Sequence, residues 1–314
     1  MNSFDTHVCI VSGQPLPNYL PAVSPQIGRD KIVLLESPSM QTQADILEAA
    51  LSKQKRHVTR YRIDDKSNLA LFRSQIEQIL AAHPNAALNA TGGLKTMSLI
   101  AYEVFRAANR PVFYSERDNR IIWLNPIENA QQKILGVLNI DDYLATFGQN
   151  ILACHRKALT NDGGEAMLHK LNTLPKAGPG DQARVGEKFE SLVFRATQNA
   201  LKQLPNIGVQ DLAWGVKIGG EARDEFDVVI ARNNTLYLIE CKNVNNVEGF
   251  NSFLNKLDTL KRKRGLTARA ALITTAHISK NSEHIRRAQE SRILLLDEHD
   301  LPQLTEKLKL WLTL

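Results

Sequence analysis

The stretch DVVIARNNTLYLIECKN, residues 227–243, constrains the fold more than any other part of the chain. Two β-rich runs flank Asn233-Asn234, which is the pattern of a β-hairpin. A two-residue loop at these asparagines and a four-residue loop around them give the same register, with Asp227 opposite Glu240. Residues that face each other across a ladder, or that lie two apart on a strand, share a face of the sheet. Asp227, Glu240 and Lys242 are therefore expected to point to one side.

This shared face brings like charges together inside an apolar hairpin. Carboxylates directly across a ladder repel each other, and unpaired charges in a buried hairpin are costly. A divalent cation removes the repulsion, and carboxylate oxygens suit Mg²⁺ or Mn²⁺. Lys242 can then hold an attacking water or offset charge at a phosphate, which is the arrangement of metal-assisted phosphodiester hydrolysis. An ordinary hairpin with a surface Asp227 and a Glu240–Lys242 pair is the alternative.

Composition limits the class of protein. A chain of 314 residues is long enough for two domains, and no apolar run of about 18 residues predicts a transmembrane helix. The first residues lack the basic start and apolar core of a signal peptide. Cys9, Cys154 and Cys241 lie far apart without metal spacing, which favours a reducing cytoplasm and no disulfide. The eight histidines show no zinc-binding spacing, and the net charge of +6 is compatible with a polyanionic partner.

Strand-like and helix-like segments alternate through the first part of the chain. This alternation predicts a doubly wound, mainly parallel α/β sheet, in which ligands bind at the carboxyl ends of strands near helix N-termini. The loop expected at 12–18 follows the first strand, and Thr91-Gly92-Gly93 precedes a helix expected at 96–108, with Lys95 adding charge. Neither loop is a P-loop. Tight-turn chemistry is the alternative explanation of the glycines.

Three segments of this region carry a family resemblance. VCIVSGQPLPNYLPAV, then VLLESPSM with QADILEAAL, then LNATGGLKTMSLIAYEVF resemble the CARF domain (CRISPR-associated Rossmann fold). The match is closest to CARF domains fused to a restriction-endonuclease-like nuclease, the ancillary nucleases of type III CRISPR antiviral defence. The resemblance implies a sensor of cyclic oligoadenylate, with cyclic tetra-adenylate as the expected activator, and a pocket shared across a homodimer. The implied ligand contacts are Ser12, Gln14, Asn18, Ser37, Thr91, Gly92, Gly93 and Lys95.

The remaining sequence predicts a linker and a second domain. Glycine and proline are frequent from 159 to 181, so we expect a sensor domain at 1–150, a linker at 151–181 and a second domain at 182–314. The segment 134–147 is expected to close the first domain. A helix expected at 184–204 is followed by a strand at 208–218 and by the hairpin. The predicted fold is thus a Rossmann-like CARF domain followed by an α/β/α domain of the restriction-endonuclease type.

The second domain resembles the PD-(D/E)-x-K nucleases. The pairing of E-F-D-V with I-E-C-K carries this resemblance, and G-E-K-F-E resembles the helix that brings a further glutamate to the metals. The resemblance implies Glu190, with Glu187 in reserve, and the Cys241 carbonyl as metal ligands beside Asp227 and Glu240. A solvated carboxylate on a helix face is the alternative for Glu190.

Charged residues flank this motif on both sides. Asp224 and Glu225 are metal neighbours or, more simply, part of a polar loop. The basic run 261–264 fits two roles equally well, namely a helix end complemented by positive charge or a nucleic-acid backbone contact.

Three functions follow as hypotheses. The first is a nuclease that needs Mn²⁺ or Mg²⁺, is activated by cyclic oligoadenylate and cuts DNA or RNA. The second is a restriction or repair endonuclease that needs no ligand. The third is a CARF binding protein that responds to its ligand without catalysis.

Overall fold

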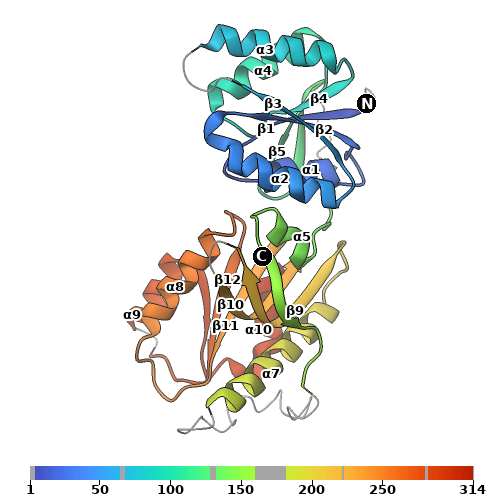
Figure 1. Ribbon diagram of the computed structural model, residues 1–314. Coiled ribbons are helices and arrows are strands. Elements are labelled where there is room, and N and C mark those ends of the chain that lie inside the picture. The colour runs from blue at the N-terminus through green and yellow to red at the C-terminus, as the bar shows by residue number, and fades with distance from the viewer. Residues whose placement is uncertain are drawn as a thin grey trace. The chain divides into compact units, whose positions relative to one another are not determined.

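The computed structural model describes residues 4–63, 68–127, 132–159, 182–220, 223–279 and 282–313, and of residues 182 and 183 only the backbone. The chain divides into two compact units, one formed by Met1–Val137 with Ala145–Gly148 and the other by Leu138–Leu144 with Gln149–Leu314. Each unit is built around one β-sheet covered by helices (Figure 1). The predicted α/β class is confirmed for both parts.

A mainly parallel sheet forms the centre of the first unit. Its strand order is β3-β2-β1-β4-β5-β6-β7, and only β6 and β7 are antiparallel to their neighbours. Helices α1 and α2 cover one face and α3 and α4 cover the other (Figure 1). The elements are β1 (Thr6–Ile10), α1 (Leu16–Val23), β2 (Lys31–Glu36), the 3-10 helix η1 (Pro38–Met40), α2 (Gln41–Lys53), β3 (His57–Arg62), α3 (Leu69–Ala82), β4 (Ala86–Asn89), α4 (Lys95–Ala107), β5 (Val112–Ser115), β6 (Arg120–Asn125) and β7 (Gln132–Lys133).

The second unit has a mixed sheet with the predicted hairpin at its centre. The strand order is β13-β12-β11-β10-β9-β8, in which β11, β12 and β13 are parallel and the others are antiparallel. The elements are α5 (Ile140–Ala145), β8 (Asn150–His155), α7 (Gln182–Lys202), β9 (Gln210–Gly219), β10 (Asp224–Arg232), β11 (Thr235–Lys242), α8 (Phe250–Arg262), β12 (Arg269–Thr274), α9 (Glu283–Glu290), β13 (Ile293–Leu296), the 3-10 helix η3 (Leu301–Gln303) and α10 (Leu304–Thr313).

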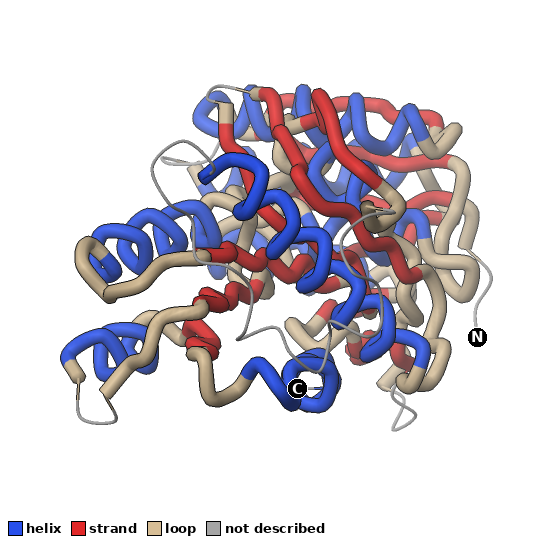
Figure 2. Tube along the Cα trace, turned by 90° about the horizontal axis from the view of Figure 1, so that it is seen from below, coloured by secondary structure: helices blue, strands red, loops and turns tan. Residues whose placement is uncertain are grey.

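Helix α7 packs along one face of this sheet beside α10, and α8 and α9 lie on the other face (Figures 1 and 2). An apolar stripe explains this position of α7, because its buried side chains recur at the spacing of a helix face. That stripe consists of Phe189, Leu192, Val193, Ala196 and Ala200.

Three segments differ from the sequence-based expectation. The loop predicted at 12–18 is shorter, because α1 begins at Leu16. The segment 134–147, expected to close the first domain, contains α5, most of which belongs to the second unit. Asn150–His155 forms β8 and pairs with β9, so the first residues of the expected linker lie in the second sheet. The rest of that linker, 160–181, lies outside the described residues, and the domain limits stay a prediction.

Candidate functional site

The β10–β11 hairpin has the predicted register. Ala231 pairs with Leu236, and the ladder runs outward to the pair Val228–Ile239, so Asp227 and Glu240 are the next residues on their strands. The loop is Asn233-Asn234, and both asparagines have positive φ angles of 49° and 58°. Two-residue hairpin loops favour this backbone conformation, which asparagine tolerates better than most residues. The turn therefore fixes which side chains share a face.

The apolar part of the hairpin is buried on both faces. Val228, Val229, Leu238 and Ile239 are fully inaccessible to solvent. The Cys241 side chain lies in the hydrophobic cluster on the α7 face, where burial raises the pKa of its thiol. The Cys241 thiol is thus part of the hydrophobic core, on the side of the sheet opposite to the Lys242 ammonium beside α8.

Glu240 and Lys242 form an ion pair at the end of β11. The Lys242 ammonium donates to Glu240 Oε1 at 2.6 Å, with side-chain exposures of 23% and 14%. The same ammonium lies 5.0 Å from the centroid of the Phe253 ring on α8. The carbonyl of Lys242 accepts hydrogen bonds from Thr275 N–H and Thr274 Oγ1, which fixes this end of β11 to β12.

Asp227 is a partly buried acid of this group. Burial raises its pKa well above the ordinary range, and the negative charges of Glu240 and Glu190 raise it further. A hydrogen bond from the Cys241 backbone N–H to Asp227 Oδ2 and the positive charge of Lys242 act in the opposite direction. Burial and the neighbouring negative charges outweigh these two effects, so the pKa of Asp227 is raised overall.

Glu190 on α7 is close enough to the hairpin for its charge to act on Asp227, Glu240 and Lys242. Burial raises the pKa of Glu190 to about 7, with Lys242 opposing and Glu225, Glu240 and Glu187 adding to the rise. Lys242 behaves differently. Burial would lower its pKa, but attraction and hydrogen bonding to Glu240 and the charge of Asp227 raise it overall.

The structure therefore brings Asp227, Glu240, Lys242 and Glu190 together from β10, β11 and α7. Three carboxylates share one ammonium, which leaves an excess of negative charge in a partly buried place. Raised carboxyl pKa values of this origin are typical of functional sites. Hard oxygen donors with unbalanced negative charge fit Mg²⁺ or Mn²⁺.

The candidate ligand-binding loops of the first unit meet at the carboxyl ends of β1 and β4. Gly92 is required there by close packing, because a Cβ atom at this position would lie 2.0 Å from the Ile10 carbonyl oxygen. Gly93 has a φ of 78° and is also packed against Ile10. The glycines therefore allow the loop before α4 to approach the end of β1.

A buried asparagine pair holds these loops together. Asn18 donates to the Ile10 carbonyl at 2.8 Å, and Asn89 donates to the Pro17 carbonyl at 2.8 Å and to Asn18 Oδ1 at 3.3 Å. Asn89 Oδ1 accepts from the backbone N–H and the hydroxyl of Thr91. Asn18, predicted as a ligand contact, thus has both ends of its amide engaged within the fold.

Asn89 was not predicted, although one signal in the sequence marks it: a polar residue that ends the apolar strand A-A-L-N. It is completely buried. Its part is to position Thr91 and Asn18.

The other predicted ligand contacts differ in exposure. Ser12, Gln14 and Thr91 are half-buried, and Gly93 and Lys95 are exposed, with Lys95 as the first residue of α4. Ser37 is 6% exposed, and its hydroxyl lies 3.1 Å from that of Ser39. A positive charge at the N-terminus of a helix is suited to an anionic ligand.

The basic run 261–264 is not one continuous basic surface. Arg264 is fully buried, where it pairs with Asp224 Oδ2 at 2.6 Å and lies 4.8 Å from the Phe226 ring centroid. Asp258 pairs with both Lys261 and Arg262, at 3.1 Å and 2.9 Å. Asp224 is therefore the partner of a buried arginine. Because Arg264 is buried and Lys261 and Arg262 are paired with Asp258, the run is less suited to contact a nucleic-acid backbone than its sequence indicates.

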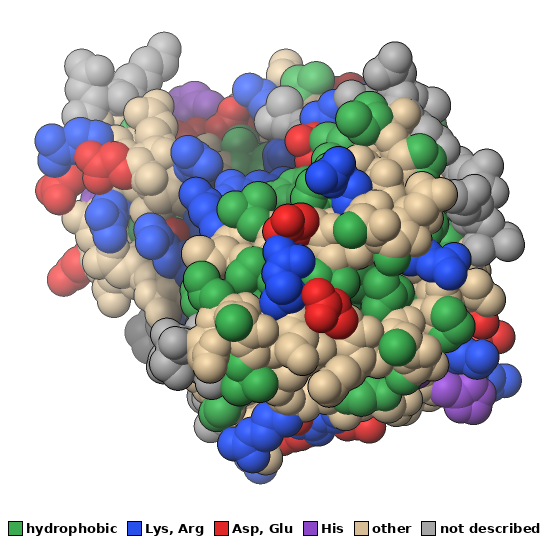
Figure 3. All heavy atoms as spheres, turned by 90° about the horizontal axis from the view of Figure 1, so that it is seen from above, with side chains coloured by type: hydrophobic (Ala, Val, Ile, Leu, Met, Phe, Trp, Pro, Cys, Tyr) green, Lys and Arg blue, Asp and Glu red, His purple; other side chains and the backbone are tan. Residues whose placement is uncertain are grey.

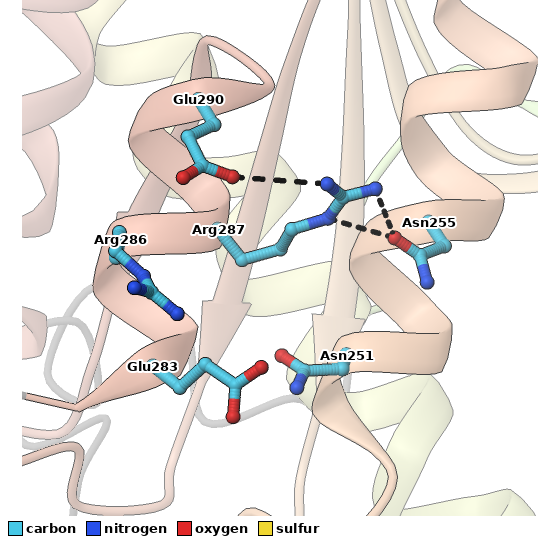
Figure 4. A pocket seen from close by; sticks show the side chains of 6 residues that line it. All are labelled: Asn251, Asn255, Glu283, Arg286, Arg287 and Glu290. Carbon is cyan, nitrogen blue, oxygen red and sulfur yellow. Dashed lines mark hydrogen bonds and ion pairs between the residues drawn. The ribbon is translucent and has the colours of Figure 1, made fainter.

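A polar pocket of about 280 Å³ lies between α8 and α9 (Figure 4). Arg287 reaches across it, donates to Asn255 Oδ1 at 2.6 Å and 2.9 Å, and pairs with Glu290 at 3.8 Å. Ligand cavities are usually lined mainly by apolar side chains, whereas only polar and charged side chains line this one. The pocket is lined by Asn251, Asn255, Glu283, Arg286, Arg287 and Glu290, none of which was predicted as a site residue.

Two family models match the chain. The model of the Card1 CARF domain matches residues 6–143, and the model of a Card1-like endonuclease domain matches residues 181–314. The protein is thus a CARF domain followed by an endonuclease domain. Since both parts are of the Card1 type, the chain belongs to the CARF-domain CRISPR nucleases, and the resemblance found in the sequence is confirmed. No curated protein sequence matches this chain.

Several solved structures have a similar fold. Protein VC1899 from Vibrio cholerae is 23% identical with a TM-score of 0.82, and the match covers 98% of both chains. Can2 from Sulfobacillus thermosulfidooxidans, in complex with cyclic tetra-adenylate, is 21% identical with a TM-score of 0.78, covering 98% of this chain and 97% of its own. A type III CRISPR defence DNA nuclease activated by cyclic oligoadenylate is 18% identical with a TM-score of 0.66, covering 87% of this chain and 46% of its own.

Within the ranges that the structure describes, no helix is both long and apolar enough to span a membrane.

Proposed function

We propose that this protein is a metal-dependent nuclease that cyclic oligoadenylate, in the first place cyclic tetra-adenylate, switches on. The observation that carries the proposal is the group Asp227, Glu240, Lys242 and Glu190, whose unbalanced negative charge lies in an endonuclease domain joined to a CARF domain. The identity of the activating ligand is inferred from two proteins of similar fold. These are Can2, whose structure is a complex with cyclic tetra-adenylate, and a DNA nuclease that is activated by cyclic oligoadenylate.

Asp227, Glu240, Glu190 and the Cys241 carbonyl would hold Mg²⁺ or Mn²⁺. Such an ion would lower the pKa of a bound water and offset negative charge on the phosphate. Burial, and then the negative charges of neighbouring carboxylates, raise the pKa values of Asp227 and Glu190, and this is the reason for expecting the group to favour a cation.

Lys242 supplies a positive charge rather than a base. Its raised pKa keeps the side chain protonated at neutral pH. An ammonium group can orient a water or neutralise a phosphate oxygen by donating hydrogen bonds, but it cannot accept a proton. Substrate is therefore expected to compete with Glu240 for this ammonium.

In the first unit, the predicted ligand contacts that solvent can reach are expected to form the binding surface. Thr91 and Lys95 lie at the start of α4, and Ser12 and Gln14 follow β1. Asn18 is proposed to position these loops. A symmetric cyclic ligand is matched by a pocket to which two chains contribute equally, so we propose a homodimer.

The test is cleavage of single-stranded DNA, supercoiled plasmid and RNA with Mn²⁺, with and without cyclic tetra-adenylate. Removing groups around a metal site, even outside its direct ligands, typically costs 10-fold to 100-fold, so Glu240→Gln is expected to lose more than about 100-fold in rate. The matched control is Glu306→Gln, which removes an exposed carboxylate of α10.

Cutting that requires both the ligand and Glu240 supports the proposal and identifies the nucleic acid. Cutting without ligand would instead indicate a restriction or repair enzyme. Tight ligand binding without any cutting would indicate a binding protein.

A further inference from the structure

A cluster of two imidazoles and a carboxylate lies outside the group described above. The ligand atoms of His277, Asp297 and His299 are all within 4.8 Å of one another. The Nδ1 atoms of the two histidines are 3.3 Å apart, and they lie 3.9 Å and 3.5 Å from the oxygens of Asp297. One metal ion can therefore be within reach of all three side chains.

The sheet brings these residues together. Strands β12 and β13 are parallel neighbours, with Ile273 paired to Leu296, so the segments that follow them begin side by side. His277 lies three residues beyond β12, Asp297 follows β13 directly, and His299 lies three residues beyond β13. A separation of about twenty residues in the sequence thus becomes direct contact in the fold.

The Asp297 carboxylate is held in place by backbone donors. Ile278 N–H donates to its Oδ2 and His299 N–H to its Oδ1, each at 3.0 Å. These bonds orient the carboxylate toward the two imidazoles. The histidine side chains remain 57% and 66% exposed, so an ion can enter from solvent.

The spacing agrees with what a tetrahedral transition metal requires. With metal–nitrogen bonds of about 2.0–2.1 Å, neighbouring ligand atoms around zinc lie roughly 3.3 Å apart. The two Nδ1 atoms already have this separation, and small side-chain rotations bring the carboxylate to it. Three protein ligands leave the fourth position of a tetrahedral ion open to water.

We propose that His277, Asp297 and His299 bind a transition-metal ion of the zinc type, at a site separate from the nuclease centre. The donor sets differ, since imidazole favours zinc-like ions and the carboxylates around Asp227 favour Mg²⁺ or Mn²⁺. The proposal depends only on this side-chain geometry and not on the proposed nuclease activity.

The site lies along the same sheet edge as the end of β11. Lys242 is paired with Thr274 at the end of β12, and β13 is the next strand, so the two places are separated by roughly 10 Å, or two strand spacings. The segment that carries His277 begins with Thr275, whose N–H donates to the Lys242 carbonyl. A bound ion would therefore tie the segment that supports this end of β11 to the segment that follows β13.

The experiment uses the full chain after treatment with EDTA. Binding of Zn²⁺ is measured by calorimetry, and binding of Co²⁺ by the visible absorption that reports tetrahedral coordination. One equivalent of Co²⁺ with this absorption is expected, and the melting temperature should rise with Zn²⁺ because the ion binds the folded chain.

Four variants make the result specific. His277→Ala and His299→Ala are expected to weaken binding at least tenfold and to lose the visible band, whereas His57→Ala removes an exposed histidine of β3 and should change neither. In a Glu240→Gln chain the zinc-like site should persist even if nuclease activity is lost, so the two proposals fail separately. Equal binding by wild type and both histidine variants would overturn the site, as would an absence of the visible band.

Discussion

At the scale of single residues, the charged group around Asp227 is held in an unfavourable state by the fold. Asp227 and Glu190 are buried beside further carboxylates, and Lys242 alone does not balance them. Proteins rarely keep such an arrangement for stability, because burial of like charges costs folding free energy. A bound cation would offset this cost, because its positive charge balances the carboxylates.

The pH dependence of stability should reveal this cost. The pKa of Glu190 rises from 4.5 to about 7 on folding, so between these values the folded chain binds more protons than the unfolded one. The free energy of unfolding of the metal-free protein therefore falls as the pH rises through this range. We expect a melting temperature that is lower at about pH 8 than at about pH 5, and a smaller fall in the presence of Mn²⁺.

Glu190→Gln is the matched variant for this measurement, since glutamine keeps the shape but does not titrate. Its melting temperature should decline less between the two pH values than that of the wild type. An identical decline in both proteins would show that Glu190 does not contribute.

Two arginines at the end of α8 offer a second test at this scale. Arg264 is fully buried against Asp224, whereas the Arg262 side chain is 74% exposed in its pair with Asp258. Removing one partner of a buried ion pair leaves the other charge uncompensated, so Arg264→Leu should cost about 3–5 kcal/mol in unfolding free energy. Arg262→Leu should cost less than about 1 kcal/mol. Denaturant unfolding of both variants measures the difference, and equal losses would contradict the assignment of Arg264 to the core.

At the scale of elements, the turn before α4 depends on a glycine. A Cβ atom on Gly92 would meet the Ile10 carbonyl oxygen, whereas one on Gly13 would meet nothing within 4 Å. Gly92→Ala should therefore destabilise the first unit by roughly 1–3 kcal/mol, as overpacking does, and weaken binding of cyclic tetra-adenylate. Gly13→Ala should be close to neutral in stability. The check is calorimetric unfolding together with ligand titration, and a stable Gly92→Ala chain with full affinity would refute the packing argument.

Local patterns predicted most of the elements. The alternation of apolar segments gave the parallel sheet of the first unit, and Asn233-Asn234 with its apolar flanks gave the hairpin and the shared face of Asp227, Glu240 and Lys242. These features depend on neighbours in sequence or on a two-residue turn. For that reason a single amino-acid sequence is enough to predict them.

What the sequence did not reveal depends on contacts between distant segments. The first turn of α1 was expected to be part of the loop at 12–18, although proline, here Pro17, is well tolerated in the first turn of a helix. Strand β8 pairs with β9 across some sixty residues, and no local pattern indicates that partner. The cluster of His277, Asp297 and His299 likewise exists only because β12 and β13 are neighbours.

At the scale of the whole molecule, the proposed homodimer needs a surface on the CARF domain. Figure 3 shows the face that carries α3 and α4, where hydrophobic side chains are scattered around a few charged ones. Leu99 on α4 is 66% exposed, and Leu94, directly before that helix, is 56% exposed beside the candidate ligand loop. A second copy of the chain that buried these leucines would also bring a second loop to the ligand.

A charge in place of Leu99 should therefore weaken the dimer and the response to ligand together. Leu310 on α10 has the same exposure of 66%, so Leu310→Lys is a matched control for a lysine on an exposed leucine. Measured by light scattering, wild type and Leu310→Lys should have the mass of two chains, while Leu99→Lys should shift toward one. Because each chain is expected to supply half of the pocket, Leu99→Lys should also bind cyclic tetra-adenylate at least about tenfold more weakly, a loss of 1.4 kcal/mol. A wild type that stays monomeric with ligand bound, or a Leu99→Lys chain that dimerises and binds normally, would exclude this surface as the place where two chains meet.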